Sequence, residues 1–210
     1  MIDWDMARLK AFDEDRAIDS AVDCFWARGY EATSVRDLGE AMGIGGASLY
    51  NAYGDKRELF IRSLERYANR SMRERVARIE ARFEPKHAIG AFLAEIIDRS
   101  AKDPDCKGCL LVNSALDVAT HDPEIGKLVA DYLGEIRAFF KRNVEAARQA
   151  GQVHKRLDSE AASAHLLGVL LGIRVLARTG AKRKLLESVA QPALALLDGA
   201  AGPAGRRNTP

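Results

Sequence analysis

The chain has little of what marks secreted, membrane-spanning or fibrous proteins. Only three of its 210 residues are cysteine, an odd number that gives no paired disulfide framework. No strongly apolar run reaches the length of about 20 residues that a membrane-spanning helix requires. The opening residues, Met1-Ile2-Asp3-Trp4-Asp5, lack the basic and apolar segments of a signal peptide. We therefore expect a reduced, cytoplasmic protein with no membrane partner.

Strand signals are missing as well. Aromatic residues make up 7% of the chain, only six residues are proline, and no segment alternates apolar and polar residues for long enough to indicate a strand. Apolar residues instead recur at steps of three and four, which predicts an all-α protein. We expect about nine helices, near residues 17–28, 34–42, 47–53, 56–83, 87–100, 109–119, 123–150, 159–178 and 182–197. The Gly-, Ala- and Pro-rich tail, residues 199–210, is expected to be disordered.

Charge is distributed unevenly along the chain, although the net charge is only +2. Residues 1–56 hold six Lys or Arg and eleven Asp or Glu, while residues 57–210 carry a net charge of +7. The net charge is therefore no evidence for a nucleic-acid partner. A DNA-binding prediction has to rest on the local arrangement of side chains.

Residues 34–53 carry the most specific pattern. One helix stops at Gly43, a turn of three to four residues follows, and a short second helix begins near Ala47, which predicts a helix-turn-helix. The second helix has small and polar residues at its N-terminal end, as a helix that enters the major groove needs. The predicted DNA-binding residues, for base edges or phosphate oxygens, are Thr33, Ser34, Arg36, Gly45, Gly46, Ala47, Ser48, Tyr50, Asn51, Tyr53 and Lys56.

Two stretches, 33–44 and 48–60, together with Gly29-Tyr30 before them, resemble the DNA-binding domain of TetR-family repressors. The likeness is strong over about fifty residues, and the helices that follow match the family more weakly. The resemblance implies an all-helical homodimer with a three-helix DNA-binding domain (residues 1–55) and a helical ligand-binding and dimerisation domain (residues 56–198). It also implies release of double-stranded operator DNA when a small-molecule effector binds. The chain departs from the commonest family pattern at Gly45 and Gly46, where a Ser and a Lys or Pro are frequent.

The helix expected over residues 159–178 is apolar on nearly every side, so more than one of its faces must be buried. Small residues four positions apart on it allow a second helix to approach closely. We interpret it, with the last helix, as the dimer surface; a core helix of a monomer and a membrane span interrupted by His165 and Arg174 are the alternatives. The predicted interface comprises Ala164, Gly168, Gly172, Val189 and Leu194.

Polar residues on the otherwise apolar helix 109–119 are the best candidates for contacting an effector. They are Asn113, Ser114 and Asp117, with His121, Tyr132, Arg137, His165 and Arg174 as further candidates. A second hypothesis uses Cys106 and Cys109, whose spacing brings two sulfurs together beside Lys107, where a thiol pKa is lowered. That chemistry suits a repressor that senses oxidants or electrophiles, whereas simple packing is the other interpretation. Cys24 lies on the core face beside Phe25 and is expected to be inert.

Catalytic and metal-binding patterns are missing from the sequence. It contains no Gly-x-Ser-x-Gly elbow, no phosphate-binding loop and no His-Glu-x-x-His motif. A zinc site would need two ligands besides the cysteine pair, and the four histidines are scattered. We expect neither an enzyme nor a bound cofactor or metal. A helical ligand-binding protein that does not bind DNA remains an open alternative.

Overall fold

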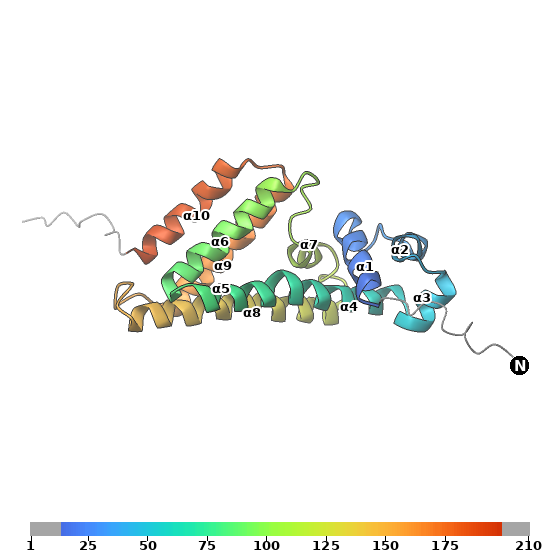
Figure 1. Ribbon diagram of the computed structural model, residues 1–210, viewed down its shortest axis with the longest axis horizontal. Coiled ribbons are helices and arrows are strands. Elements are labelled where there is room, and N and C mark those ends of the chain that lie inside the picture. Colours follow the sequence, from blue (N-terminus) through green and yellow to red (C-terminus); the bar gives the residue numbers. More distant parts are fainter. Residues whose placement is uncertain (1–13, 199–210) are drawn as a thin grey trace, which may run out of the picture. The chain divides into compact units, whose positions relative to one another are not determined.

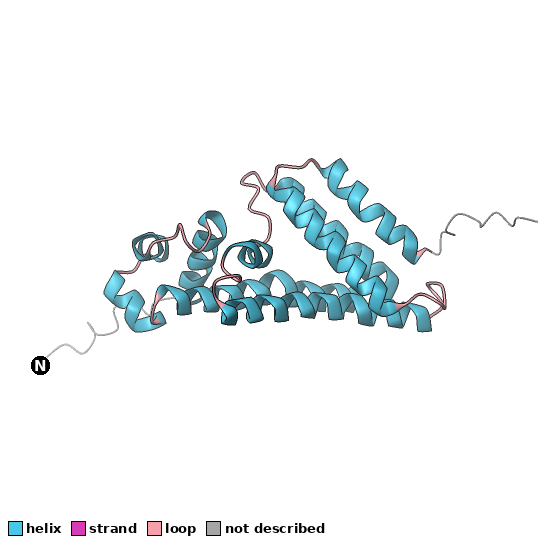
Figure 2. Cartoon of the chain, turned by 180° about the vertical axis from the view of Figure 1, so that it is seen from behind, coloured by secondary structure: helices cyan, strands magenta, loops and turns pink. Residues whose placement is uncertain are grey.

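A computed structural model describes residues 14–198 of the chain, and every regular element in that range is a helix (Figures 1 and 2). The all-α prediction is thus confirmed, while the expected disordered tail lies outside the described residues. The elements are α1 (Glu14–Arg28), α2 (Val35–Met42), α3 (Gly46–Tyr53), α4 (Lys56–Ala68), the π-helix η2 (Asn69–Arg73), α5 (Glu74–Arg82), α6 (Pro85–Lys102), α7 (Leu110–Asp117), α8 (Pro123–Gln149), α9 (Ser159–Arg178) and α10 (Arg183–Leu197).

Capping residues set several helix starts where the sequence predicts them. The Ser34 hydroxyl accepts a hydrogen bond from the Asp37 N–H, and the Asp37 carboxylate accepts one from the Ser34 N–H, so the two residues cap α2 reciprocally. Asp55 caps α4 by accepting from the Glu58 N–H at 2.8 Å, and Asp158 caps α9 in the same way. At the other end of α2, Gly43 adopts a left-handed conformation with φ 69°, which glycine takes without strain.

The helix expected over residues 56–83 contains an unexpected feature. A π-helical turn, η2, separates α4 from α5, and counting the three segments as one continuous helix gives the nine helices predicted. A π turn accommodates one extra residue in a helical turn and is often found at functional positions. The apolar periodicity on either side does not reveal such an insertion.

The chain forms two compact units. The first contains residues 14–73 and Cys109–Ala130, and the second contains Glu74–Gly108 and residues 131–198. The first unit therefore extends beyond residue 55, because α4 packs against α1 and α7. The chain passes from the first unit to the second directly after η2.

Aromatic side chains form the centre of the first unit. Phe25 of α1 and Phe60 of α4 are at most 1% exposed, and their ring centroids lie 4.9 Å apart in an edge-to-face arrangement. The Tyr30 ring lies 4.8 Å from that of Phe60. This cluster fixes α1 on α4 and so supports the two short helices that follow α1.

A second aromatic cluster lies in the core of the second unit. Phe92 of α6 contacts Phe139 and Phe140 of α8, with ring centroids 5.0 and 5.6 Å apart. Helices α6, α9 and α10 lie side by side in this unit (Figures 1 and 2). The Arg142 side chain ties α8 to α5 by donating to the Glu80 carboxylate at 2.7 and 2.9 Å.

Candidate DNA-binding surface and regulatory unit

A tight turn fixes how α3 follows α2. The Ile44 N–H donates to the Gly39 carbonyl at 3.0 Å, and a Cβ atom on Gly39 would lie only 2.9 Å from the Ile44 carbonyl oxygen. Residue 39 must therefore stay small for the backbone to fold back so closely. Together with Gly43, this contact builds the predicted helix-turn-helix.

Helix α3 has one buried and one exposed face. Leu49 and Tyr53 are buried, whereas Ala47, Ser48 and Asn51 are exposed and Tyr50 is 53% exposed. The N-cap residue, Gly45, offers no side-chain acceptor to the first N–H groups of the helix. The exposed N-terminal end of α3 therefore keeps its unpaired N–H donors and the positive end of its dipole.

The two glycines at this end are not required by packing within the chain. A Cβ atom on Gly45 or Gly46 would have nothing within 4 Å, and neither residue has a positive φ. Their lack of a side chain leaves the start of α3 open to a close approach from outside. A helix entering a DNA groove makes such an approach.

Ser34, Arg36 and Lys56 flank the start of α2 and the end of α3, as predicted. Ser34 is exposed and the Arg36 side chain is 87% exposed, although its guanidinium pairs with Glu40 on the next turn. Lys56 is half-buried, with its ammonium 4.3 Å from the centre of the Tyr30 ring. It is therefore already held by a cation–π contact.

Two of the predicted DNA-binding side chains are not on the surface. Thr33 is fully buried, and its hydroxyl donates to the Gly29 carbonyl at 2.6 Å, so it closes the end of α1. Tyr53 is only 4% exposed, because it lies one turn after Leu49 on the inner face of α3. The prediction that the Thr33 and Tyr53 side chains lie on the DNA-binding surface is therefore wrong, because both are buried.

The acidic residues near the N-terminus are partly neutralised by arginines of the long helix. The Asp19 carboxylate pairs with Arg66 at 2.8 Å and with Arg70 at 2.6 Å. The hydrogen bond from Arg66, opposed by burial and aided by Arg70, holds the pKa of Asp19 below its usual value. Asp37 likewise pairs with Arg28 at 2.5 Å. The net charge of residues 1–56 therefore overstates the unpaired negative charge in this segment.

The predicted effector residues of α7 lie in the first unit. Ser114 is 3% exposed and its hydroxyl donates to the Leu110 carbonyl of its own helix at 2.7 Å. Asp117 is exposed near Gly29, and Asn113 is half-buried. The Ser114 hydroxyl is thus occupied within α7, and the effector role of these three residues stays a prediction.

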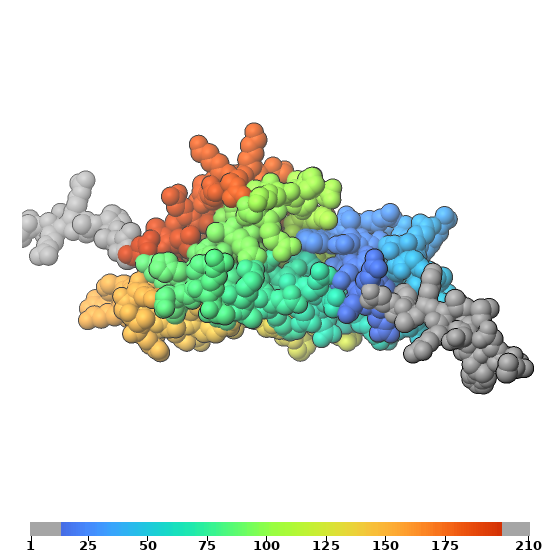
Figure 3. Space-filling view, viewed as in Figure 1, coloured from blue at the N-terminus to red at the C-terminus, as the bar shows by residue number. Residues whose placement is uncertain are grey.

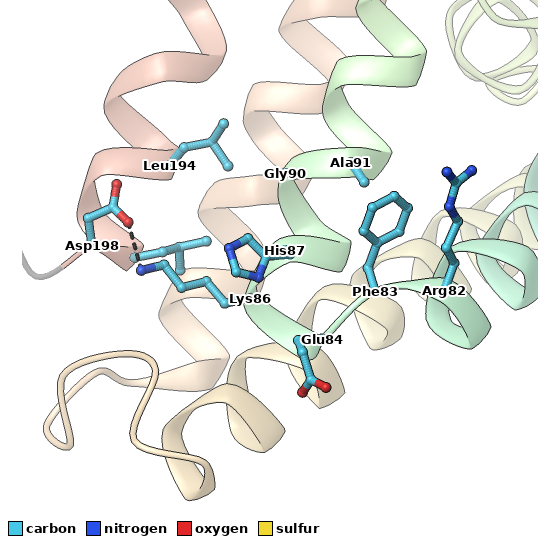
Figure 4. Close-up of a pocket in the computed structure, with 10 residues that line it drawn as sticks. Arg82, Phe83, Glu84, Lys86, His87, Gly90, Ala91, Leu194 and Asp198 are labelled. Carbon is cyan, nitrogen blue, oxygen red and sulfur yellow. Dashed lines mark ion pairs between the residues drawn. The ribbon is translucent and has the colours of Figure 1, made fainter.

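Two grooves in the second unit lie between α6 and α10, whose surfaces adjoin (Figure 3). The larger has a volume of about 630 Å³ and the smaller about 370 Å³, and Gly90 and Leu194 line both. Figure 4 shows the larger groove, with the Lys86–Asp198 ion pair at one end and Arg82 and Phe83 at the other. None of the predicted effector residues lines either groove. Sequence reasoning missed them because the groove walls come from helices far apart in the chain.

The cysteine pair lies on and beside the loop between α6 and α7. Cys106 is half-buried with a left-handed φ of 49°, and Cys109 is 7% exposed. Burial raises the pKa of the Cys24 thiol, which agrees with the expected inert role of that residue. No group of three or more metal-ligating side chains occurs within residues 14–198. The burial of Cys109 favours packing over thiol sensing.

The predicted dimer residues lie on partly exposed apolar faces of the second unit. Ala164 and Gly168 are exposed, Gly172, Val189 and Leu194 are half-buried, and a Cβ on either glycine would have nothing within 4 Å. Larger apolar side chains extend these faces: Val175, Leu185 and Leu196 are 45%, 48% and 56% exposed. One described helix, α9, is long and apolar enough to cross a membrane, a test that core helices of soluble proteins also pass.

A helix-turn-helix with an exposed, small-residue recognition face, joined to a separate helical unit, defines a DNA-binding transcriptional regulator. The family models agree with this class. Residues 17–62 match the model for bacterial regulatory proteins of the tetR family, and residues 85–192 match the tetracyclin repressor-like C-terminal domain. The chain belongs to the TetR family of transcriptional regulators, whose members act on DNA and are not enzymes.

Relatives match over nearly the whole chain. The uncharacterized HTH-type transcriptional regulator YezE of Bacillus subtilis (strain 168) is 29% identical over 92% of this chain and 100% of its own. The HTH-type transcriptional repressor ComR of Escherichia coli (strain K12) is 30% identical over 90% of each chain. Among solved structures, a cysteine mutant of the TetR-family regulator CifR, in complex with 26-base-pair operator DNA, is 30% identical. It has a TM-score of 0.81 and covers 90% of this chain and 99% of that one.

Proposed function

We propose that this protein is a homodimeric, cytoplasmic repressor that binds operator DNA through α3 and releases it when a small molecule binds. The observation that carries the proposal is the exposed face of α3, with two glycines whose side-chain space is empty and an uncapped, positive N-terminus. The complex of CifR with operator DNA and the naming of ComR as a repressor support the same role.

The exposed side chains divide into two kinds of DNA contact. Asn51 carries an amide that can pair bidentately with adenine in the major groove, so we assign it to base reading. Tyr50 and Ser34 carry hydroxyl groups, and Arg36 a guanidinium, suited to phosphate oxygens. The phosphate contacts would position α3, and the base contact would give the sequence preference.

Dimerisation would use the exposed apolar faces of α9 and α10. Gly168 and Gly172 leave room along α9 for a second helix to approach, and Leu185 and Leu196 on α10 would be covered at the same time. Two copies would present two α3 helices to half-sites one helical turn, about 34–36 Å, or a small multiple of it apart.

Release by an effector would depend on the helix that joins the two units. It runs from Lys56, directly after the helix-turn-helix, to Arg82 in the second unit, and η2 interrupts it where the units meet. A ligand that binds one conformation about a hundredfold more tightly supplies about 2.7 kcal/mol toward that conformation. That difference is enough to empty much of the bound population.

Binding to the DNA upstream of the protein's own gene tests the proposal. Fluorescence anisotropy should show tight binding that weakens steeply with salt concentration. Asn51→Ala should cost about 1–3 kcal/mol on the preferred sequence and relax the preference, whereas Tyr50→Phe should weaken all sequences alike. Binding no tighter to this DNA than to an unrelated duplex, together with no effect of either variant, would contradict the proposal.

A further inference from the structure

The two grooves between α6 and α10 adjoin and form one elongated groove in the second unit, the α6–α10 groove. Gly90 of α6 and Leu194 of α10 line both parts. The lining residues of α6 extend from Lys86 to Ile97, and eleven residues of helix span about 16 Å. The volumes of about 630 and 370 Å³ lie in the range of sites that hold small molecules.

The middle of this groove is apolar and open. Leu93 and Ile97 of α6 and Ala190 of α10, each at most 4% exposed, line it beside Leu194. A Cβ atom on Gly90 would meet nothing within 4 Å, so packing within the chain does not require glycine there. Glycine in the middle of a helix is destabilising relative to alanine. The missing side chain leaves space between the two helices for an apolar ligand.

The charged lining residues make the two ends of the groove different. At one end Lys86 pairs with Asp198 at 2.7 Å, and Figure 4 shows the Glu84 carboxylate pointing away from Leu194. Arg82 lines the same end and is exposed, with its guanidinium 5.4 Å from the centre of the Phe83 ring.

Arg82 has no carboxylate partner among residues 14–198, although carboxylates are available to other arginines of this unit. At the opposite end of the groove, Arg183 already pairs with Asp98 at 2.5 Å and with Glu187 at 3.6 Å. The groove therefore offers a ligand one unpaired guanidinium, at the end near α5. An anionic group on the ligand would complement it.

The groove lies on the side of α10 opposite to the proposed dimer face. Leu185 and Leu196 are eleven residues apart, about three turns, so they lie on one side of the helix. Leu194 lies about 160° around the helix from Leu196. A second copy that covered Leu185 and Leu196 would therefore leave the groove accessible to a small molecule.

We propose that the α6–α10 groove binds the effector, and that the effector is a linear acyl chain ending in a carboxylate. The chain would lie along Gly90 and Leu194, and the carboxylate would pair with Arg82, whose planar guanidinium matches two oxygens. The site deepens the proposed function and rests on it for the link to DNA. Arg82 is the last residue of α5, which continues through η2 into α4, directly after the helix-turn-helix. A ligand that moves Arg82 acts on this helix.

Calorimetric titration of the full-length protein without DNA tests the site independently of repression. Sodium decanoate, below its micelle concentration, should bind saturably. Octanoate and hexanoate should bind progressively more weakly, by about two- to fourfold for each CH₂ removed. Sodium acetate should have no effect beyond that of sodium chloride at equal ionic strength.

Two variants separate the contribution of the chain from that of the charge. Gly90→Leu fills the middle of the groove and should abolish decanoate binding, while the open space at its Cβ lets the protein fold. Gly134→Leu on α8, whose Cβ also meets nothing within 4 Å, is the matched control outside the groove and should bind decanoate like the wild type. Arg82→Gln should weaken octanoate about two- to fivefold and leave the uncharged octan-1-ol unaffected.

The outcomes distinguish this site from the repressor function. No saturable binding of decanoate, full binding in Gly90→Leu, or equal losses of octanoate and octan-1-ol in Arg82→Gln would overturn the acyl-carboxylate site. A rise in the dimer dissociation constant of Gly90→Leu, measured by light scattering, would make the groove an interface between copies and also overturn it.

Decanoate should also weaken binding of the wild-type protein to its upstream DNA but not that of Gly90→Leu. Decanoate binding that leaves the DNA affinity unchanged would overturn the effector role of the groove. Decanoate binding by a protein that binds no DNA would overturn the repressor function and leave the acyl-carboxylate site standing.

Discussion

The two compact units balance their charged and apolar groups differently. In the first unit, acidic and basic side chains form ion pairs. Asp19 pairs with Arg66 and Arg70, and Arg57 pairs with Asp122 at 2.5 Å. In the second unit Arg174 contacts only neutral acceptors, and α9 and α10 expose large apolar side chains. The first unit exposes fewer large apolar side chains, Tyr50 of α3 at 53% and Leu116 of α7 at 73%. The second unit also contains ion pairs, Arg142–Glu80 and Arg183–Asp98, so the contrast lies in Arg174 and in the exposed apolar faces of α9 and α10.

The difference does not arise from the quality of the cores. Phe25 and Phe60 in the first unit are as fully buried as Phe92 and Phe139 in the second. Both cores can therefore support rigid helices, and the contrast lies in what the surfaces leave open. Substitutions can test the comparison on either side.

The largest effect is expected in the core of the first unit. Phe25→Ala removes a fully buried ring that contacts both Phe60 and Tyr30, and should lower the free energy of unfolding by about 3–5 kcal/mol. Phe83→Ala, at a ring that is 37% exposed, should change it by less than about 1 kcal/mol. Urea denaturation measures both, and equal losses would show that the aromatic cluster does not hold this unit.

Next in size is the effect on the proposed dimer. Gly168→Leu adds a large side chain where a second helix would approach, and a misfit of about 1–3 kcal/mol would raise the dimer dissociation constant about 5- to 150-fold. Gly134→Leu on α8 is the control, since its Cβ also meets nothing within 4 Å but it lies outside the predicted interface. Light scattering over a dilution series separates them. A Gly168→Leu protein as dimeric as the wild type would move the interface elsewhere.

A smaller effect is expected at the start of α3. Gly46→Ala should stabilise the protein by about 0.4–1 kcal/mol, because alanine restricts the unfolded chain and meets no neighbour in the folded one. The same substitution should weaken DNA binding, since its methyl group faces the approaching groove. Gly134→Ala should give a similar stability gain with unchanged DNA affinity. Unchanged affinity in both variants would mean that the glycine does not serve DNA approach.

The smallest effect concerns pH. The hydrogen bond from Arg57 lowers the pKa of Asp122 from 3.8 to about 2. A carboxyl group whose pKa falls on folding stabilises the protein above about pH 4, and this contribution is lost as the pH falls toward 2. Asp122→Asn keeps a residue able to cap α8 but removes the titration. Its urea midpoint should fall less between pH 4 and pH 2 than that of the wild type; parallel pH profiles would argue against the pair.

The sequence predicts the helix ends better than the burial of individual side chains, for a physical reason. Helix caps such as Ser34 and Asp158, and turn glycines such as Gly43, act on neighbours within four residues, so they can be recognised from the sequence. The bounds of α9 follow in the same way. The burial of Thr33 and Tyr53 depends on packing against other helices, and the sequence alone assigned both side chains to the surface.

Arg75 shows most clearly what the sequence alone cannot predict. Arg75 is one of eight arginines between residues 57 and 82, and nothing local distinguishes it from its exposed neighbours. Its burial becomes evident only when Glu95 of α6 is placed against it. Arg174 stands out in the sequence as a charge on an apolar helix, but its lack of a carboxylate partner depends on the fold. The sequence likewise contains no pattern that predicts the π turn at residues 69–73.

The exposed N-terminal end of α3 is the central claim, and an introduced negative charge tests it most directly. Ala47→Glu places a carboxylate among the exposed N–H groups that we assign to DNA, and Ala138→Glu places one on the exposed face of α8 in the second unit. Both variants should unfold at nearly the wild-type temperature. The affinity for the upstream DNA should fall at least about a hundredfold in Ala47→Glu, because like charges at a close interface cost several kcal/mol. It should stay within about threefold in Ala138→Glu. Wild-type affinity in a folded Ala47→Glu protein would contradict the assignment of α3 as the DNA-binding helix.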